Sequence, residues 1–313
     1  MIRAYFLACF CVFTLSTKAQ QNTIIEGDIK SPYNEPVSLI LYKHVNMAEN
    51  TFNQGLVDSS FKFKFILTEP AYFTLITNRT TFKLFLIEPG DSIHFDMNIL
   101  KVEDVKFSGA GSDKANYQHW AHIRYQDWYH PPVNNASDTG QRYFKYLDSC
   151  RSPQLYSLYN FKGLLTPIAY EILRADIFYG FENLKSKYLT GLLSDSTSVD
   201  QARLLYELYS PIRKEFIFDD TLAYSRNLIA FLMQQNEVDC EYLRVQDNWS
   251  EKYKLAKKHT KGKIQERLLA VLLLTQDTTA INKDVLQCAG DYLKGPYDPL
   301  YKELIRRKFE LHK

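Results

Sequence analysis

The chain has few cysteines, and none of them are paired at the spacing of a redox or zinc-binding motif. Five cysteines occur in 313 residues, and two of them, Cys9 and Cys11, lie in an N-terminal leader. The others, Cys150, Cys240 and Cys288, are widely separated, which excludes a local C-x-x-C pair and a zinc knuckle. Three cysteines cannot all pair with one another. One long-range disulfide is an alternative, but we expect three buried free thiols.

An excess of charge of one sign is also missing. The chain has 38 Lys and Arg against 36 Asp and Glu, and the leader holds two of the bases, Arg3 and Lys18. A balanced chain gives no electrostatic basis for binding nucleic acid or an anionic membrane surface. We therefore expect no nucleic-acid partner, and the lysine-rich stretch 252–263 is predicted to be a solvated helix face.

The first 19 residues hold an apolar run that is too short for a comfortable membrane span of about 20 residues. Arg3 precedes the run Ala4–Leu15, and the small-x-small pattern that ends at Ala19 is typical of a signal-peptide cleavage site. We expect cleavage near Ala19, export to the periplasm or cell envelope, and no transmembrane span in the mature chain. The alternatives are an uncleaved anchor and acylation of Cys9 or Cys11, although the apolar run before Cys9 is short.

Alternating apolar residues predict that the chain continues with antiparallel strands. In 58–67, Phe61, Phe63 and Phe65 alternate with lysines, which is the period of a half-buried strand. Glu88–Asp91, EPGD, has Pro and Gly where a type II turn requires them. Further strands are predicted over 23–30, 35–43, 71–77, 81–87, 92–97 and 105–108. Residues 20–110 are therefore predicted to form a small antiparallel β-sandwich or barrel.

From Ser112 onward the pattern is helical. Ser112 and Asp113 are expected to cap a helix that reaches Trp128, and Thr166-Pro167 opens a helix to about Leu193. Further helices are predicted after the capping sequence 219–221 and over 262–275, 285–293 and 299–311. No fixed repeat supports a solenoid. The predicted fold class is α+β, with an irregular α-helical bundle over 111–313 after the β-sandwich.

The order of GDIK, EPVSLILYK, SSFKFKF, PAYFTLI, IEPGDSIHFDM and FSGAGSDKANYQ resembles the DUF4369 domain. The resemblance covers about residues 22–120 and rests mainly on the PGDSI turn and the FSGAGSDKANY corner. The chain departs from the family at Asn53-Gln54-Gly55 and the DSS before Phe61, where an Asp-Gly turn often precedes the aromatic strand. DUF4369 commonly precedes a thioredoxin-like domain in secreted bacterial proteins of the TlpA/AhpC-TSA type.

The resemblance also extends weakly into the helices. DDTLAYSRNLIAFL and TKGKIQERLLAVLLL look like the helical linker that follows DUF4369 in those proteins. The W-C-x-x-C active site of their thioredoxin-like domain is absent, and Cys288 has no partner cysteine nearby. A thiol reductase needs a reactive thiolate and a second, resolving thiol. The activity of the longer proteins therefore does not carry over to this chain.

Two histidines are the only candidates for metal ligands. His119 and His122 stand at i and i+3 of the first predicted helix and could present imidazoles on one face. No carboxylate completes a recognised motif, and Trp120 and Trp128 indicate packing in the same region. We expect ordinary, partly exposed histidines, no metal and no cofactor.

Other candidate groups have structural explanations. Asp91 is expected to cap the amides of its turn, and Gly109–Ser112, which resembles a phosphate cradle, lacks the P-loop lysine and is predicted to be a chain-reversing corner. No nucleophile elbow occurs, and neither His94 nor His259 has the context of a catalytic triad. No catalytic residue is assigned, although an enzyme is not excluded.

These observations favour an exported, non-catalytic binding or accessory protein of the bacterial cell envelope, with a thioredoxin-like protein or another envelope protein as partner. One alternative is the N-terminal portion of a thiol–disulfide oxidoreductase system that acts with a separate thioredoxin-like domain. Another is a surface module that captures glycans or peptides through aromatic side chains. The 22 Tyr and 20 Phe are expected mostly in the core, so an exposed aromatic cleft between sandwich and bundle would be informative.

Overall fold

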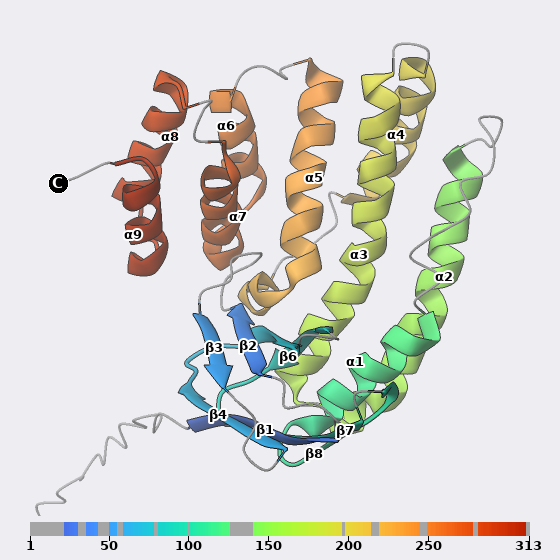
Figure 1. Ribbon diagram of the computed structural model, residues 1–313. Helices are drawn as coiled ribbons and strands as arrows, with labels where there is room; N and C mark the ends of the chain where they lie inside the picture. The colour runs from blue at the N-terminus through green and yellow to red at the C-terminus, as the bar shows by residue number, and fades with distance from the viewer. Residues whose placement is uncertain are drawn as a thin grey trace, which may run out of the picture.

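The computed structural model describes residues 22–30, 36–42, 50–54, 59–77, 81–98, 100–125, 140–195, 198–213, 219–244, 249–277 and 281–310. The predicted leader, with Cys9 and Cys11, and Trp128 lie outside these residues. Within the described ranges all strands precede all helices, which confirms the predicted α+β class (Figure 1). None of the helices in these ranges is both long enough and apolar enough to cross a membrane.

The strands form two four-stranded sheets. One has the order β4 (Ser60–Ile66), β1 (Asn22–Lys30), β7 (Ser92–Asn98), β8 (Lys101–Ser108). The other has the order β3 (Asn50–Gln54), β2 (Val37–Tyr42), β5 (Ala71–Ile76), β6 (Thr81–Ile87).

Two details of these sheets differ from the sequence prediction. The pair β1–β7 is parallel, whereas all other neighbours are antiparallel as expected. Strand β1 and strand β7 are far apart in the chain, and alternation within a strand does not reveal the direction of its partner. Strand β3 was not predicted, because NTFNQ is polar at most positions.

Aromatic rings fill the space between the two sheets. Phe95 lies at the centre, with ring centroids 4.8 Å from Phe107, 6.0 Å from Phe73, 6.2 Å from Phe85 and 6.3 Å from Phe61. Complete burial of a Phe side chain contributes about 1.5–3 kcal/mol. Most of the sandwich phenylalanines therefore belong to the core, as predicted.

Helices account for the rest of the described chain. They are α1 (Ser112–Tyr125), α2 (Gly140–Phe161), α3 (Pro167–Ser194), α4 (Val199–Arg213), α5 (Arg226–Leu243), α6 (Trp249–His259), α7 (Gly262–Thr275), α8 (Lys283–Lys294) and α9 (Pro299–Lys308), with short 3-10 segments η2 (Lys162–Leu164) and η3 (Asp220–Tyr224). Helices α2 to α9 stand side by side in Figure 1, and one end of α3, of α5 and of α7 faces the sandwich.

Capping residues explain where several helices begin. Thr166 caps α3 as predicted, since its Oγ1 accepts a hydrogen bond from the Ala169 N–H at 3.0 Å. Asp219 caps only η3, and the predicted single helix after it was wrong. Ser225 instead caps α5, where its Oγ accepts from the Leu228 N–H at 3.1 Å. Helices α2 and α4 were not predicted from the sequence, although Ser198 and Gln201 have the spacing of a capping box at the start of α4.

Helix α1 closes one side of the sandwich by bonding the edge strand of each sheet. On β6, the Gln118 side-chain Oε1 accepts from the Leu86 N–H at 2.8 Å and its Nε2 donates to the Leu84 carbonyl at 3.3 Å. On β8, Asn116 Nδ2 donates to the Phe107 carbonyl at 3.0 Å. Exposed strand edges invite pairing with other chains, so these side chains cover edge groups that would otherwise be open.

Candidate functional site

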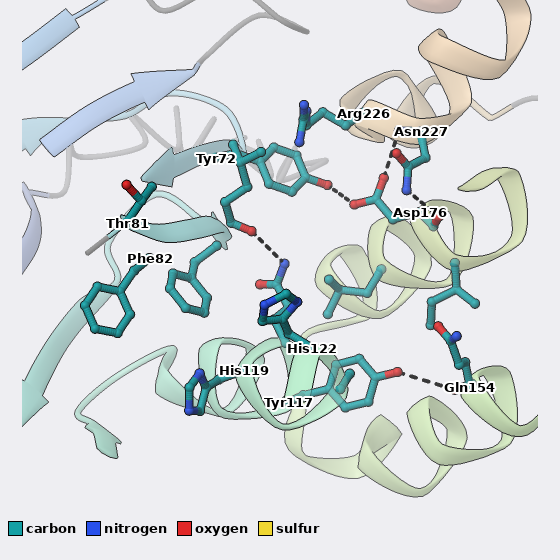
Figure 2. Close-up of a pocket in the computed structure, with 16 residues that line it drawn as sticks. Tyr72, Thr81, Phe82, Tyr117, His119, His122, Gln154, Asp176, Arg226 and Asn227 are labelled. Carbon is teal, nitrogen blue, oxygen red and sulfur yellow. Dashed lines mark hydrogen bonds between the residues drawn. The ribbon is translucent and has the colours of Figure 1, made fainter. Parts of the chain in front are cut away.

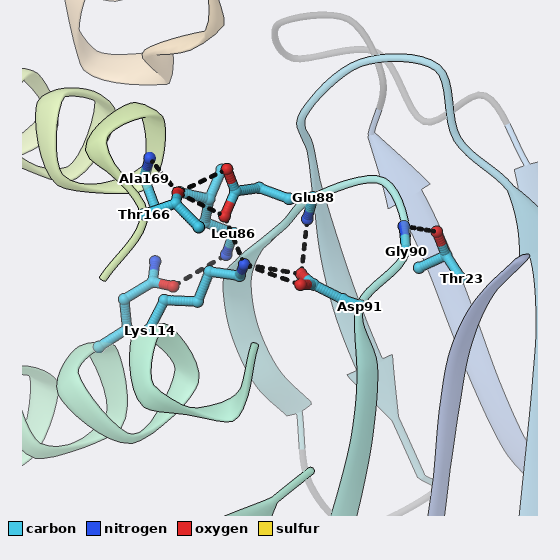
Figure 3. A network of polar contacts seen from close by, with 9 residues as sticks. Thr23, Leu86, Glu88, Gly90, Asp91, Lys114, Thr166 and Ala169 are labelled. Atoms are coloured by element: carbon cyan, nitrogen blue, oxygen red, sulfur yellow. Dashed lines mark hydrogen bonds and ion pairs between the residues drawn. The ribbon is translucent and has the colours of Figure 1, made fainter. Parts of the chain in front are cut away.

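A buried ionic cluster joins the sandwich to α1 and α3. Lys114 of α1 donates through Nζ to Glu88 Oε2 at 2.6 Å and lies 2.8 Å from Asp91 Oδ2 (Figure 3). Thr166 Oγ1, the α3 cap, donates to Glu88 Oε1 at 2.8 Å. Lys114, Glu88 and Asp91 are each at most 8% exposed. One ammonium is thus paired with two carboxylates, and hydrogen bonds from Thr166 and from the Glu88 N–H further stabilise the two buried carboxylates.

The turn that supplies Asp91 has the predicted geometry. Gly90 takes a φ of 86°, as the third position of a type II turn requires, and the Asp91 carboxylate accepts from the Glu88 N–H at 2.7 Å. Burial raises the pKa of Asp91, while the neighbouring Lys114 ammonium and the Glu88 N–H act in the opposite direction. Asp91 therefore caps its turn, as its turn position predicted, and it also pairs with Lys114, which was not predicted.

The Gly-rich corner before α1 is also structural. Gly109 and Gly111 have φ angles of 91° and 84°, in the left-handed region that favours glycine. The Ser92 N–H donates to the Ala110 carbonyl at 2.9 Å, which ties the corner to the start of β7. A Cβ on Gly111 would lie 2.1 Å from Asp91 Oδ1. The space beside the corner is thus occupied by Asp91, and the corner reverses the chain between β8 and α1, as predicted.

A cleft of about 380 Å³ lies between sheet edge and helices, and it is the strongest candidate for a ligand site (Figure 2). Strands β5 and β6 form one wall, and α1, α2, α3 and the start of α5 form the others. Aromatic and polar side chains share its lining: Tyr72, Thr81, Phe82, Phe85, Tyr117, Gln118, His119, His122, Gln154, Asp176, Arg226 and Asn227. The cleft lies between sandwich and bundle, but the Phe and Tyr rings that line it are at most 5% exposed, so it is not an exposed aromatic cleft.

Asp176 organises one end of this cleft. Its carboxylate accepts hydrogen bonds from the Tyr72 hydroxyl, from Ser225 Oγ at 2.7 Å and from the Asn227 N–H at 3.2 Å. Asn227 Nδ2 also donates to the Asp176 carbonyl at 2.7 Å. Burial raises the pKa of Asp176, against the effect of the donors around it and of the nearby Arg226 charge.

The two histidines singled out from the sequence both line the cleft. His119 Nε2 lies 3.1 Å from the Glu103 carbonyl oxygen, and its ring meets Phe107 edge-on with centroids 5.7 Å apart. His122 is exposed. No group of three or more His, Cys, Asp or Glu side chains in the described ranges is arranged to hold a metal ion. Both histidines border the cleft, and His119 is additionally held against the edge strand β8.

Cys150, Cys240 and Cys288 are free and buried, as the sequence indicated. Burial raises the pKa of Cys240 to about 11 and also raises that of Cys288. A reactive cysteine needs a lowered pKa and access to its substrate. Neither thiol has these properties.

A serine, an aspartate and a histidine meet on the outer face of the other sheet. Ser60 Oγ donates to Asp28 Oδ1 at 2.6 Å, and His94 Nε2 lies 3.3 Å from Asp28 Oδ2. The aspartate stands between the other two, so the histidine cannot take a proton from the serine as a triad requires. The prediction that His94 has no triad context agrees with this geometry.

Sequence reasoning missed Tyr72, Asp176, Arg226 and Asn227. Tyr72 and Asp176 are 104 positions apart, so no local motif could join them. One signal was present, since Asp176 is an acid within the otherwise apolar part of the predicted helix after Thr166. Neither a protein-family model nor a curated protein matches the chain. The DUF4369 resemblance stays a prediction that rests on the segments quoted above.

Proposed function

We propose that the chain is an exported, non-catalytic binding protein of the bacterial cell envelope whose ligand site is the cleft beside β6. The observation that carries the proposal is the cleft itself, where polar side chains from both halves of the chain converge beside Phe and Tyr rings that are almost fully buried. Its volume of about 380 Å³ lies within the range of about 300–1,000 Å³ for small-molecule sites.

The lack of an activated group in the described residues supports a binding role over a catalytic one. Asp176 is the buried carboxylate of the cleft, and three donors already hold it. A general base must reach the proton that it removes, and a nucleophile needs such a base beside it. The buried thiols of Cys240 and Cys288 have raised rather than lowered pKa values.

Export and membership of the DUF4369 family are parts of the same proposal. They are supported by the leader pattern of the first 19 residues and by the PGDSI and FSGAGSDKANY segments. The alternative, action beside a separate thioredoxin-like domain, rests on the resemblance alone. Reciprocal pull-down of a thioredoxin-like envelope protein by the mature chain would favour that alternative.

A matched pair of substitutions tests the cleft. His122 and Ile123 are neighbours on α1 and both are exposed, but only His122 lines the cleft. We would screen a fragment library by ligand-observed NMR against the unchanged protein, His122→Trp and Ile123→Trp. Compounds should bind the unchanged protein and the Ile123 variant and lose binding to the His122 variant. A screen without hits, or hits that bind both variants equally, would contradict the proposal.

A further inference from the structure

We propose that the outer edge of strand β4 binds an extended, acidic segment of a partner protein, which adds to its four-stranded sheet as a further strand. The described residues that line the cleft include none from β4, so this surface is separate from the proposed ligand site and does not depend on it. Strand addition combines backbone hydrogen bonds, which give affinity, with side-chain pairing, which gives specificity. The geometry of β4 supplies both.

The two sides of the sandwich differ in how their strand edges are covered. On one side, Asn116 and Gln118 of α1 bond backbone groups of both edge strands, β6 and β8. On the side away from α1, β3 and β4 are the last strands of their sheets (Figure 1). Among the described residues, only Gln54 of β3 bonds the outward backbone of β4, where its Oε1 accepts from the Lys62 N–H at 3.0 Å. An unpaired strand edge is a template for another strand.

Two hydrogen bonds of β1 show which residues of this strand face β4. In a sheet, alternate residues of a strand direct their N–H and C=O groups to opposite neighbours. The Ile24 N–H donates to the Asp91 carbonyl at 2.9 Å, toward β7, and the Ile29 N–H donates to the Ser59 carbonyl at 2.8 Å, toward β4. The odd-numbered residues of β1 therefore bond β4.

The same alternation places the backbone of Lys64 and Ile66 on the open edge. The odd-numbered residues of β1 stand opposite Phe61, Phe63 and Phe65, so these three bond β1. The even-numbered residues of β4 then point their N–H and C=O groups away from β1, as the bond from the Lys62 N–H to β3 confirms. A further strand can pair with this part of β4 without breaking any bond of the sheet.

The side chains along this edge present a cation on one face and half-buried rings on the other. Lys64 is exposed and forms no ion pair with any described residue, whereas Lys62 is paired with Glu26 at 2.6 Å. On the inner face, Phe65 is half-buried and stacks on Phe52 of β3, with ring centroids 5.8 Å apart and planes 16° apart. The edge therefore carries a free positive charge outside and an incompletely covered aromatic pair inside.

These side chains define the partner strand. The residue opposite Lys64 shares its face and is favoured as an acid, because opposite charges across strands attract and like charges repel. The residues before and after that acid face inward, beside Phe65 and Phe52, and are favoured as apolar. Antiparallel pairing of β4 with a second copy would gather Lys62 and Lys64 of both chains on one face, and lysines on an edge act against such pairing. The partner is therefore a different chain with alternating acidic and apolar residues.

Titration of the isotope-labelled mature chain with short peptides, followed by amide NMR, tests the inference. The probe is Thr-Val-Glu-Val-Glu-Val-Thr, blocked at both ends, and its charge-reversed control has Lys in place of Glu. The acidic peptide should shift the amide signals of Lys64 and Ile66 and slow their hydrogen exchange. The basic peptide should bind at least about tenfold more weakly.

A matched pair of protein variants tests the charge. Lys64 and Lys106 are exposed on the same face of the same sheet, but Lys106 lies on β8, at the opposite edge. Lys64→Glu should weaken binding of the acidic peptide at least about fivefold, because it places like charges opposite each other. Lys106→Glu makes the same change in net charge and should leave the affinity within about twofold.

N-methylated peptides test the backbone ladder without changing the protein. One carries N-methyl groups on both glutamates and another on two valines. In an antiparallel strand with a glutamate opposite Lys64, the glutamate N–H groups point toward β4 and the valine N–H groups point away. Methylation of the glutamates should therefore abolish binding, and methylation of the valines should be tolerated.

Several results would overturn the inference. They are absence of binding by the acidic peptide, equal loss of binding for the two N-methylated peptides, and an affinity that Lys64→Glu leaves unchanged. Concentration-dependent shifts of the Lys64 and Ile66 amides without peptide would assign the edge to a second copy of the chain and would also overturn it. None of these results bears on the cleft, which the fragment screen tests separately.

Discussion

Two lysine–glutamate pairs of equal length provide a direct test of how burial determines the role of an ion pair. Lys114 Nζ lies 2.6 Å from Glu88, with both side chains at most 10% exposed. Lys62 Nζ also lies 2.6 Å from a glutamate, Glu26, across the β1–β4 pair, but these side chains are 58% and 32% exposed. We would replace each lysine by methionine, which keeps the side-chain length and removes the charge.

The two substitutions should differ several-fold in cost. Lys114→Met leaves Glu88 and Asp91 buried beside each other without their cation, and loss of one partner of a buried pair costs about 3–5 kcal/mol. Lys62→Met removes an exposed cross-strand pair worth about 0.2–1 kcal/mol. Urea unfolding followed by circular dichroism gives both free energies of unfolding, provided that the slope with urea is unchanged.

The pH dependence gives an independent check on the cause. Lys114 lowers the pKa of Asp91, against the larger upward effect of burial, so the pKa of Asp91 should rise further in Lys114→Met. The folded variant then binds a proton at a pH where the unfolded chain, with an Asp pKa of about 3.9, does not. Its stability relative to the unchanged protein should therefore improve as the pH falls from 7 to 5. Equal costs for Lys114→Met and Lys62→Met, or a deficit that grows toward acid, would refute the reasoning.

Three further predictions concern single sites. Gly111→Ala should destabilise the fold by more than about 1 kcal/mol, because its φ is 84° and its Cβ would lie 2.1 Å from Asp91 Oδ1. In the control Gly191→Ala in α3, the new Cβ meets no atom within 4 Å, so this substitution should stabilise the fold by about 0.5–1 kcal/mol. If thermal unfolding showed that both glycine substitutions change the stability in the same direction, the strained role of Gly111 would be contradicted. Cys240, with a pKa of about 11, should resist iodoacetamide at pH 8 in the folded protein and react after unfolding, and rapid native labelling in mass spectrometry would disprove its burial. Asp176 should titrate above the usual Asp pKa of about 3.9 in carboxyl NMR, with Asp176→Asn used for assignment, and a midpoint at or below that value would show that its donors outweigh desolvation.

Local chemistry made the corner between strands and helices predictable. A Pro-Gly turn, a run of glycines and a Ser-Asp pair each have few conformations available, so Glu88–Asp91 and Gly109–Ser112 could be assigned from the sequence. The structure adds the contacts that these turns make. Lys114 donates hydrogen bonds to Glu88 and Asp91, and it lies in the same SDKANYQ segment as Asn116 and Gln118, which bond the sheet edges.

Partners across the chain could not be predicted in the same way. The parallel pairing of β1 with β7 and the bond between Tyr72 and Asp176 both join residues that are far apart in the sequence. The pattern of a strand predicts its buried face, and the pattern of a helix predicts its apolar side. Neither pattern predicts which other strand or helix packs against that face. The cleft depends on such contacts between distant segments. The spacing of His119 and His122 on one helix could be seen in the sequence, whereas Tyr72, Asp176 and Arg226 on the other walls could not be assigned to the same site.

The placement of α1 connects the stability of the junction to ligand binding. Its Lys114 is held in the buried cluster, its Asn116 and Gln118 bond the two sheet edges, and its His122 lines the cleft. A substitution that weakens the contacts of Lys114 should therefore also displace His122. Lys114→Met should weaken both folding and ligand binding, whereas His122→Trp should weaken binding alone. If Lys114→Met retained full affinity at a temperature where it is folded, the cleft would not depend on the anchoring of α1.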